Sequence, residues 1–140
     1  MANNGRTVLM YSLDAMATSV QKVLSPHLIA LRTQNGDAHF VLFPHADEAE
    51  MERALAAFNE GVWEAIVAHN SGTYRRNWPV DYCYDENDGT LVVYNDRNER
   101  IYGLTAGIDE RNAGRLFAAF HAGWMASIEA ILKGQDNADN

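Results

Sequence analysis

Cysteine is nearly absent from this chain of 140 residues, since Cys83 is the only one. A single thiol excludes an intramolecular disulfide and leaves a zinc site without a second sulfur ligand. Cys83 falls in an expected strand, where a thiol usually packs as a small apolar side chain. We therefore predict a packed structural cysteine and not a nucleophile.

Long apolar runs are also missing. No segment approaches the roughly 18 consecutive apolar residues of a membrane-spanning helix, so we expect no membrane partner. The first residues lack the charged, apolar and small regions of a signal peptide, and with the lone cysteine this predicts a cytoplasmic location. Residues 1–6 and 134–140 hold few apolar side chains and are expected to be disordered tails.

Positive charge is scarce and scattered. The chain has 11 Lys and Arg against 19 Asp and Glu, a formal net charge of −8, and only Arg75 and Arg76 are adjacent. Phosphate binding needs clustered cations, so we expect no direct nucleic-acid partner. The acidic balance suits solubility and contact with a basic protein.

Sequence signatures of catalysis are missing as well. The chain has neither the G-x-S-x-G nucleophile turn nor the glycine-rich loops of nucleotide-binding enzymes, and its histidines never fall at H-x-x-x-H spacing. We predict no catalytic residue, no cofactor and no metal ligand. The alternative is a small enzyme or small-ligand binder whose site forms only in the fold, from Tyr82, Tyr84, His39 and the acids of Asp85–Asp88.

The acidic segment Asp81–Asp88 invites comparison with a calcium loop. With the following glycine at position 6 of an EF-hand loop, Glu86 and Asp88 fall at liganding positions 3 and 5. The same alignment places Tyr84 at position 1 and Asn95 at position 12, where carboxylates are needed. A solvated hairpin turn is the better interpretation.

The N-terminal half predicts a strand, a short helix and a hairpin. The apolar run Thr7–Tyr11 predicts the strand, and apolar residues at helical spacing predict the helix over Leu13–Leu24, with Ser12 as N-cap.

Two apolar runs, Leu28–Gln34 and Asp37–Phe43, flank Asn35-Gly36, a dipeptide favoured in two-residue type I′ turns. Such a turn pairs Leu31 with Phe40. Both faces of the hairpin are mostly apolar, so we expect both to be covered.

A long amphipathic helix is predicted over Asp47–Ala68, where acidic residues crowd the first turns. Its apolar stripe is formed by Met51, Leu55, Phe58, Val62 and Ile66, and is widened by Trp63 and Val67. After a polar connector, strands are expected over Val80–Tyr84, Thr90–Tyr94 and Arg100–Leu104. The last helix is predicted over Asp109–Lys133, with Asp109 as N-cap and Gly134 just beyond its end.

The connector combines aromatic and cationic side chains in Tyr74, Arg75, Arg76 and Trp78. This combination is typical of protein-binding hot spots and also occurs at single-stranded nucleic-acid sites. The acidic balance of the chain favours a protein contact. Packing of Trp78 under the loop is the structural alternative.

The last helix lacks a clear polar face. Its large apolar residues are Phe117, Phe120, Trp124, Ile128 and Ile131, and the opposite side carries Ala119, Gly123, Ala126 and Ala130. A helix without a polar face is usually buried on both sides, so these small residues predict contact with a second protomer or a partner protein. Solvent-exposed alanine is the alternative.

The segment Thr90–Leu132 resembles the closing half of class I type III secretion chaperones and related chaperone-like domains. Those proteins end in an apolar strand, a polar turn, a second strand, a short acidic cap and an amphipathic helix. The resemblance implies a small acidic homodimer that binds other proteins. The N-terminal half departs from the family, which opens with a helix followed directly by three strands, because here a strand is expected before the helix.

These expectations define one α+β domain over residues 1–140. An antiparallel sheet of about five to six short strands, including the Asn35-Gly36 hairpin, packs against two long amphipathic helices and one short helix. We interpret the chain as a non-enzymatic protein-binding module, either secretion-chaperone-like or inhibitory, that forms a homodimer. The inhibitory hypothesis is an immunity or phage anti-defence protein acting through its acidic surface. The sequence does not identify the partner protein.

Removal of divalent metals should leave the thermal stability unchanged. A metal that binds only the folded state raises the unfolding midpoint, and its removal lowers that midpoint by mass action. We expect the same Tm, measured by circular dichroism, with and without EDTA. A drop of several degrees would restore Asp81–Asp88 as a candidate ligand cluster.

Overall fold

A computed structural model describes residues 13–104 and 109–139. In chain order the elements are β1 (Ala17–Lys22), β2 (Leu28–Thr33), β3 (Ala38–Leu42), α2 (Glu48–Asn70), β4 (Asp81–Asp85), β5 (Thr90–Tyr94), β6 (Arg100–Leu104), a 3-10 helix η1 (Glu110–Asn112) and α3 (Ala113–Asp139). The expected strand Thr7–Tyr11, the N-cap Ser12 and the tail 1–6 lie outside the described residues.

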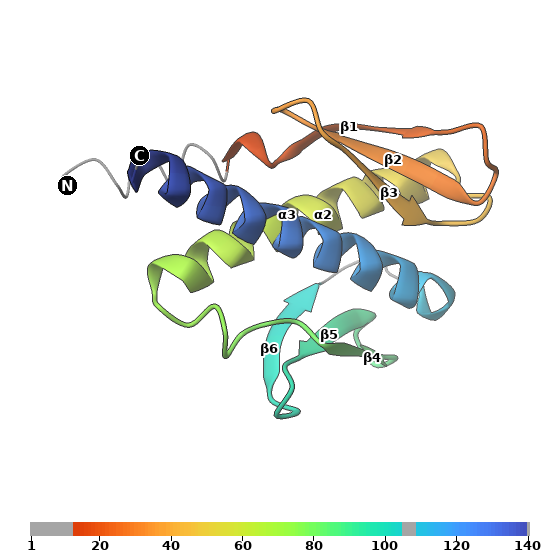
Figure 1. The fold of residues 1–140 in the computed structure, drawn as a ribbon. Coiled ribbons are helices and arrows are strands. Elements are labelled where there is room, and N and C mark those ends of the chain that lie inside the picture. The colour runs from red at the N-terminus through yellow and green to blue at the C-terminus, as the bar shows by residue number, and fades with distance from the viewer. Residues whose placement is uncertain (1–12, 105–108, 140) are drawn as a thin grey trace.

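The strands form two antiparallel sheets, β1-β2-β3 (the first sheet) and β4-β5-β6 (the second sheet). The two long helices lie between these sheets in Figure 1. The α+β class is therefore confirmed. The prediction of one larger sheet is wrong, because each group of three strands pairs only within itself in the part of the chain that is described.

Residues 17–22 form strand β1, although a helix was predicted over Leu13–Leu24. Only residues 13 and 14 of that range are helical. β1 pairs with β2, and the Asn59 side chain of α2 holds its first residue: Asn59 Oδ1 accepts from Ala17 N–H at 2.7 Å, and Asn59 Nδ2 donates to Ala17 O at 3.0 Å. Pairing with distant partners overrides the local helical pattern, because strand formation depends on cross-strand packing.

The β2–β3 hairpin has a three-residue loop in place of the predicted two-residue turn. Thr33 N–H donates to Asp37 O at 2.9 Å, and Gly36 alone of the loop residues has a positive φ, of 93°. A type I′ turn needs two such residues, whereas a three-residue loop needs one. Leu31 is therefore opposite His39 and not Phe40, so the predicted register is wrong by one residue.

Helix α2 agrees with its predicted range and begins with a capping box. The Asp47 side chain accepts from Glu50 N–H at 2.7 Å, and Glu50 Oε1 accepts from Asp47 N–H at 2.9 Å. Two residues predicted to widen its buried stripe, Trp63 and Val67, are instead 47% and 44% exposed. The stripe is widened by Ala54, Ala57, Gly61, Ala65 and Ala68, whose small side chains admit a close neighbour.

Helix α3 differs from its prediction at both ends. Asp109 precedes η1 and makes no side-chain capping bond. The helix continues through Gly134 to Asp139, so Gly134 does not end it and residues 134–139 are not an unstructured tail. One glycine costs a helix only about 1 kcal/mol and does not by itself terminate it.

Helices α2 and α3 run in the same direction and touch backbone to backbone. Their starts are joined by a hydrogen bond from the Asn112 amide to Glu50 Oε2, while their later turns share a second apolar cluster around Trp124. A Cβ atom added at Gly61 would overlap the Phe120 carbonyl oxygen, and one added at Gly123 would overlap the Phe58 carbonyl oxygen. Only glycine fits at these two positions.

The small-residue side of α3 therefore packs within the chain. Ala119 is fully buried, Gly123 lies against α2, and Ala126 is 8% exposed. The prediction that Ala119 and Gly123 face a second protomer is wrong, because α2 supplies the layer that was expected from a partner. Residues from both sheets complete the core: Ile29, Leu31, Val41, Leu91 and Val93 join Phe58 and Phe120 in one buried cluster.

Gly123→Ala should destabilise the protein by about 3 kcal/mol, because the added methyl group overlaps backbone of α2 and forces the helices apart. Gly114→Ala is a matched control in the same helix. Its Cβ would meet the hydroxyl end of Tyr82 at 2.7 Å, a side chain that can move, so the change should stay within about 1 kcal/mol. Urea unfolding followed by circular dichroism measures both. A Gly123→Ala variant as stable as the wild type would contradict the close helix contact.

Candidate protein-binding surface

Strand β3 is an edge of the first sheet in residues 13–104, where its one strand neighbour is β2. At the two ends of this ladder, residues 37 and 43 make backbone hydrogen bonds to the β2 side, with N···O distances of 2.9 and 2.8 Å. Bonded and non-bonded pairs alternate in an antiparallel ladder. The N–H and C=O groups of the even-numbered residues Phe40 and Leu42 therefore point away from β2.

The same two residues expose apolar side chains. Phe40 is 61% exposed and Leu42 is 48% exposed. Leu28 lies directly opposite Leu42 on β2 and is half-buried, and Ala30 lies opposite Phe40. Ala30 is fully buried, so we call Leu28, Phe40 and Leu42 the β3 surface.

The prediction that both hairpin faces are covered is thus wrong for the outer face. The two apolar faces were visible in the sequence, but which of them other elements cover was not. An antiparallel sheet with one covered face usually carries polar side chains on the other, and an apolar outer face marks an interaction site.

The other strand edges carry features that discourage pairing with another chain. β1 contains Lys22 and a register shift near its start, β4 begins with Asp81 and ends with Asp85, and β6 begins with Arg100. β3 has the sequence AHFVL, without Lys, Asp, Glu or Pro, and its ladder with β2 is regular. Edge strands without such protection are the ones to which other strands add.

The inner side of β3 is anchored in the core. The His39 ring lies 5.2 Å from the Phe58 ring of α2, and Val41 and Phe43 are buried. The edge is therefore held in one position before any partner arrives. Such preorganisation reduces the entropy cost of binding.

The predicted connector residues are engaged within the chain. The Trp78 ring packs edge-on against Trp124, with centroids 6.2 Å apart, and Tyr74 packs against the same cluster. Arg75 lies over the Tyr74 ring at 5.7 Å. These contacts favour the alternative that Trp78 packs under the loop. A partner contact at Arg75 and Arg76 stays a prediction.

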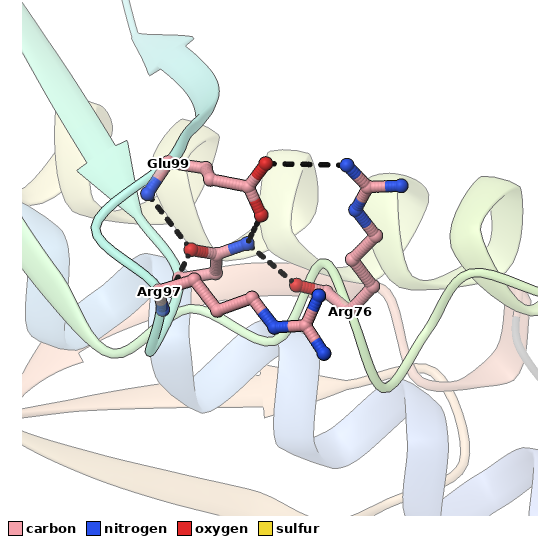
Figure 2. A network of polar contacts seen from close by, with 4 residues as sticks. Arg76, Arg97 and Glu99 are labelled. Carbon is pink, nitrogen blue, oxygen red and sulfur yellow. Dashed lines mark hydrogen bonds and ion pairs between the residues drawn. The ribbon is translucent and has the colours of Figure 1, made fainter.

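Asn95 ties the β5–β6 turn to this connector. It is 3% exposed, and its amide donates to Arg76 O at 2.9 Å and to Glu99 Oε1 at 3.0 Å. Its Oδ1 accepts from Arg97 N–H at 3.0 Å and from Glu99 N–H at 2.9 Å. Figure 2 shows these bonds and the 3.2 Å ion pair between Arg76 and Glu99. Hydrogen bonds from Asn95 and from Arg76 lower the pKa of the Glu99 carboxyl.

The C-terminal part of the small-residue side borders a cavity of about 250 Å³. Ala126 and Ala130 line it together with three acids, Asp14, Asp37 and Glu129, and with His39 and Lys133. The surroundings of these two alanines are therefore acidic and partly open, unlike the water-free contact expected between two protomers.

The residues considered for a fold-formed enzyme site do not come together. His39 lies in the first sheet, whereas Tyr82 and Tyr84 lie in the second. Asp85 stabilises its own turn by accepting from Asn87 N–H at 2.9 Å, as a solvated hairpin turn predicts. Cys83 is exposed, so the expectation of a packed thiol is wrong. In β4 its side chain points to the face opposite that of Tyr82, whose ring stacks on Phe117 of α3.

Besides Glu99, three described groups have shifted pKa values, and burial is the largest cause of each shift. Burial, and then the nearby Glu60, raise the pKa of Glu64. Burial, and then the Glu64 charge, raise the pKa of Tyr102. Burial lowers the pKa of His121. These groups lie on α2, β6 and α3 and not on the β3 surface.

Among residues 13–104 and 109–139, no three His, Cys, Asp or Glu side chains are grouped so that they could hold a metal ion. In that same part of the chain, neither long helix is apolar enough over a sufficient length to cross a bilayer. No protein-family model matches the chain, and no curated protein or solved structure matches it significantly. Function is therefore argued from the surfaces themselves.

Asn95→Ala should lower the free energy of unfolding by about 2 kcal/mol, because buried backbone groups of the connector and the turn lose their hydrogen bonds. Arg76→Gln should leave it nearly unchanged, since the ion pair with Glu99 is solvent-exposed. Urea unfolding of the two variants makes the comparison. Equal losses would mean that the ion pair, and not the amide, holds the connector.

Proposed function

We propose that this chain is a non-enzymatic protein-binding module that takes up an extended apolar segment of another protein along β3. The observation that carries the proposal is a coincidence at Phe40 and Leu42. Both residues expose an apolar side chain, and both direct unpaired backbone groups to the sheet edge. In strand addition, backbone bonds supply affinity and alternate side chains supply specificity. A segment with apolar residues at every second position matches both features.

The order of elements supports a role similar to that of class I type III secretion chaperones. The predicted departure from that family was a strand before a helix over Leu13–Leu24; that strand lies outside the described residues, and β1 largely replaces the helix. Three strands therefore precede α2 directly, and three strands and the amphipathic α3 follow it. The strand, turn, strand and terminal helix after β4 are the elements on which the resemblance was based. Likeness of fold alone does not identify a partner, so the β3 surface carries the argument.

The alternative binding partner for the edge of β3 is a second copy of this chain. The predicted homodimer rested on Ala119 and Gly123, and both now pack against α2. Interfaces of obligate dimers bury about 2,000 Å² or more. The three side chains of the β3 surface are few for such an interface, which favours a different protein as the occupant. The same apolar surface also favours segment uptake over the inhibitory hypothesis, which relies on acidic side chains.

The double substitution Phe40→Glu, Leu42→Glu tests the proposal. Both side chains are exposed, so the variant should fold with a stability within about 0.5 kcal/mol of the wild type. We expect wild-type protein to bind, on an array of short random peptides, those with apolar residues at alternate positions. The double variant should lose about tenfold or more in affinity for them, because charges replace the apolar contacts.

Met125→Glu is the matched control, since Met125 is 40% exposed on α3 and should retain peptide binding. Undiminished binding by the Phe40→Glu, Leu42→Glu variant would contradict the proposal. Sedimentation velocity separates the occupants: a wild-type dimer that the double variant converts to a monomer would identify a second copy as the natural occupant.

A further inference from the structure

A second cavity opens where the two long helices begin. It has a volume of about 340 Å³ and lies between the β3–α2 connector and the start of α3. Pro44 and His45 of the connector line it together with Arg111, Asn112 and Arg115. Residues four positions apart share one face of a helical segment, so the two guanidinium groups lie on the same side.

Neither arginine has a carboxylate partner among the described side chains, in which the ion pair present is Arg76–Glu99. Glu50 also lines the cavity, but its carboxylate already accepts hydrogen bonds from Asp47 N–H and from the Asn112 amide. The sequence of residues 1–12 and 105–108 contains no Asp or Glu that could supply another carboxylate. The lining of this cavity therefore holds the two positive charges of Arg111 and Arg115 against the one negative charge of Glu50, in a chain of net charge −8.

The backbone at the start of α3 adds to this positive potential. The first N–H groups of a helix lack internal acceptors and favour an anion. At α2 the Asp47 carboxylate fills that role; α3 has no acidic residue in its own first turn, although Asp109 and Glu110 stand at the start of η1, which leads directly into it. The Ala113 N–H donates to Glu110 O, and a bound anion would add an acceptor for the N–H groups that follow it.

We propose that this cavity binds a compact oxyanion, the phosphate or carboxylate group of a small molecule, with Arg111 and Arg115 as its ion-pairing groups. A guanidinium group presents paired N–H donors that match two oxygens of such an anion. The volume falls within the range of about 300–1,000 Å³ typical of small-molecule sites, so the oxyanion can carry an organic group. None of the lining residues belongs to the β3 surface, and this proposal stands or falls independently of the protein-binding function.

The test is an NMR titration of the ¹⁵N-labelled full chain with sodium phosphate and, in a second arm, with sodium succinate. Sodium chloride holds the ionic strength constant, because exposed charges are screened by any salt. We expect the amides of residues 45 and 111–115 to shift and to saturate. The arm that saturates at the lower concentration identifies phosphate or carboxylate as the preferred group. Shifts that do not saturate, or that spread over the whole surface, would overturn the proposal.

The variant Arg111→Gln, Arg115→Gln should weaken binding by about tenfold or more, since it removes both charge-assisted contacts. Arg75→Gln removes an arginine outside the cavity and should bind as the wild type does. If the glutamine variant does not fold, Arg111→Lys, Arg115→Lys retains the charge and should still weaken binding through loss of the paired donors. Unchanged affinity in the folded double variant would refute the assignment.

Discussion

The backbone contact between α2 and α3 is the constraint on which the other contacts of this structure depend. Gly61 and Gly123 each place a hydrogen atom where any side chain would overlap a carbonyl oxygen of the opposite helix. Because the helices are parallel, the chain must return along a helix of about 35 Å before α3 can begin. Residues 71–112 make this return, and the second sheet forms within them. Both sheets then pack on the helix pair and share its buried cluster.

The parallel arrangement also determines where charge gathers. Both helices start at the same end, where the capping residue Glu50 is bonded to Asn112 of the approach to α3. Glu50 forms no ion pair with Arg111 or Arg115, and its single negative charge offsets only part of their two positive charges. The cavity at this end is cationic, although the chain as a whole is acidic. Net charge is thus a poor guide to the chemistry of one small site.

The first sheet contributes only one face to the core. Ile29, Leu31 and Val41 bury the inner side of the hairpin, and Phe40 and Leu42 are exposed on the outer side. Burial of those two side chains therefore contributes little to the stability of the isolated chain. The apolar area that remains is available for association, and the regular ladder of β3 directs that association along an extended segment.

The local sequence pattern determined those elements whose structure depends on residues close to them in the chain. The apolar stripe and the capping residues after Asp47 specified α2, and polar turns bounded β5 and β6. Tertiary structure decided what depends on residues far away along the chain. Residues 17–22 form a strand because β2 and the Asn59 side chain make hydrogen bonds with their backbone. Gly123 is packed inside the chain because α2 lies against it. The physical reason is that periodicity shows which residues share a face, whereas burial depends on what the fold places opposite that face.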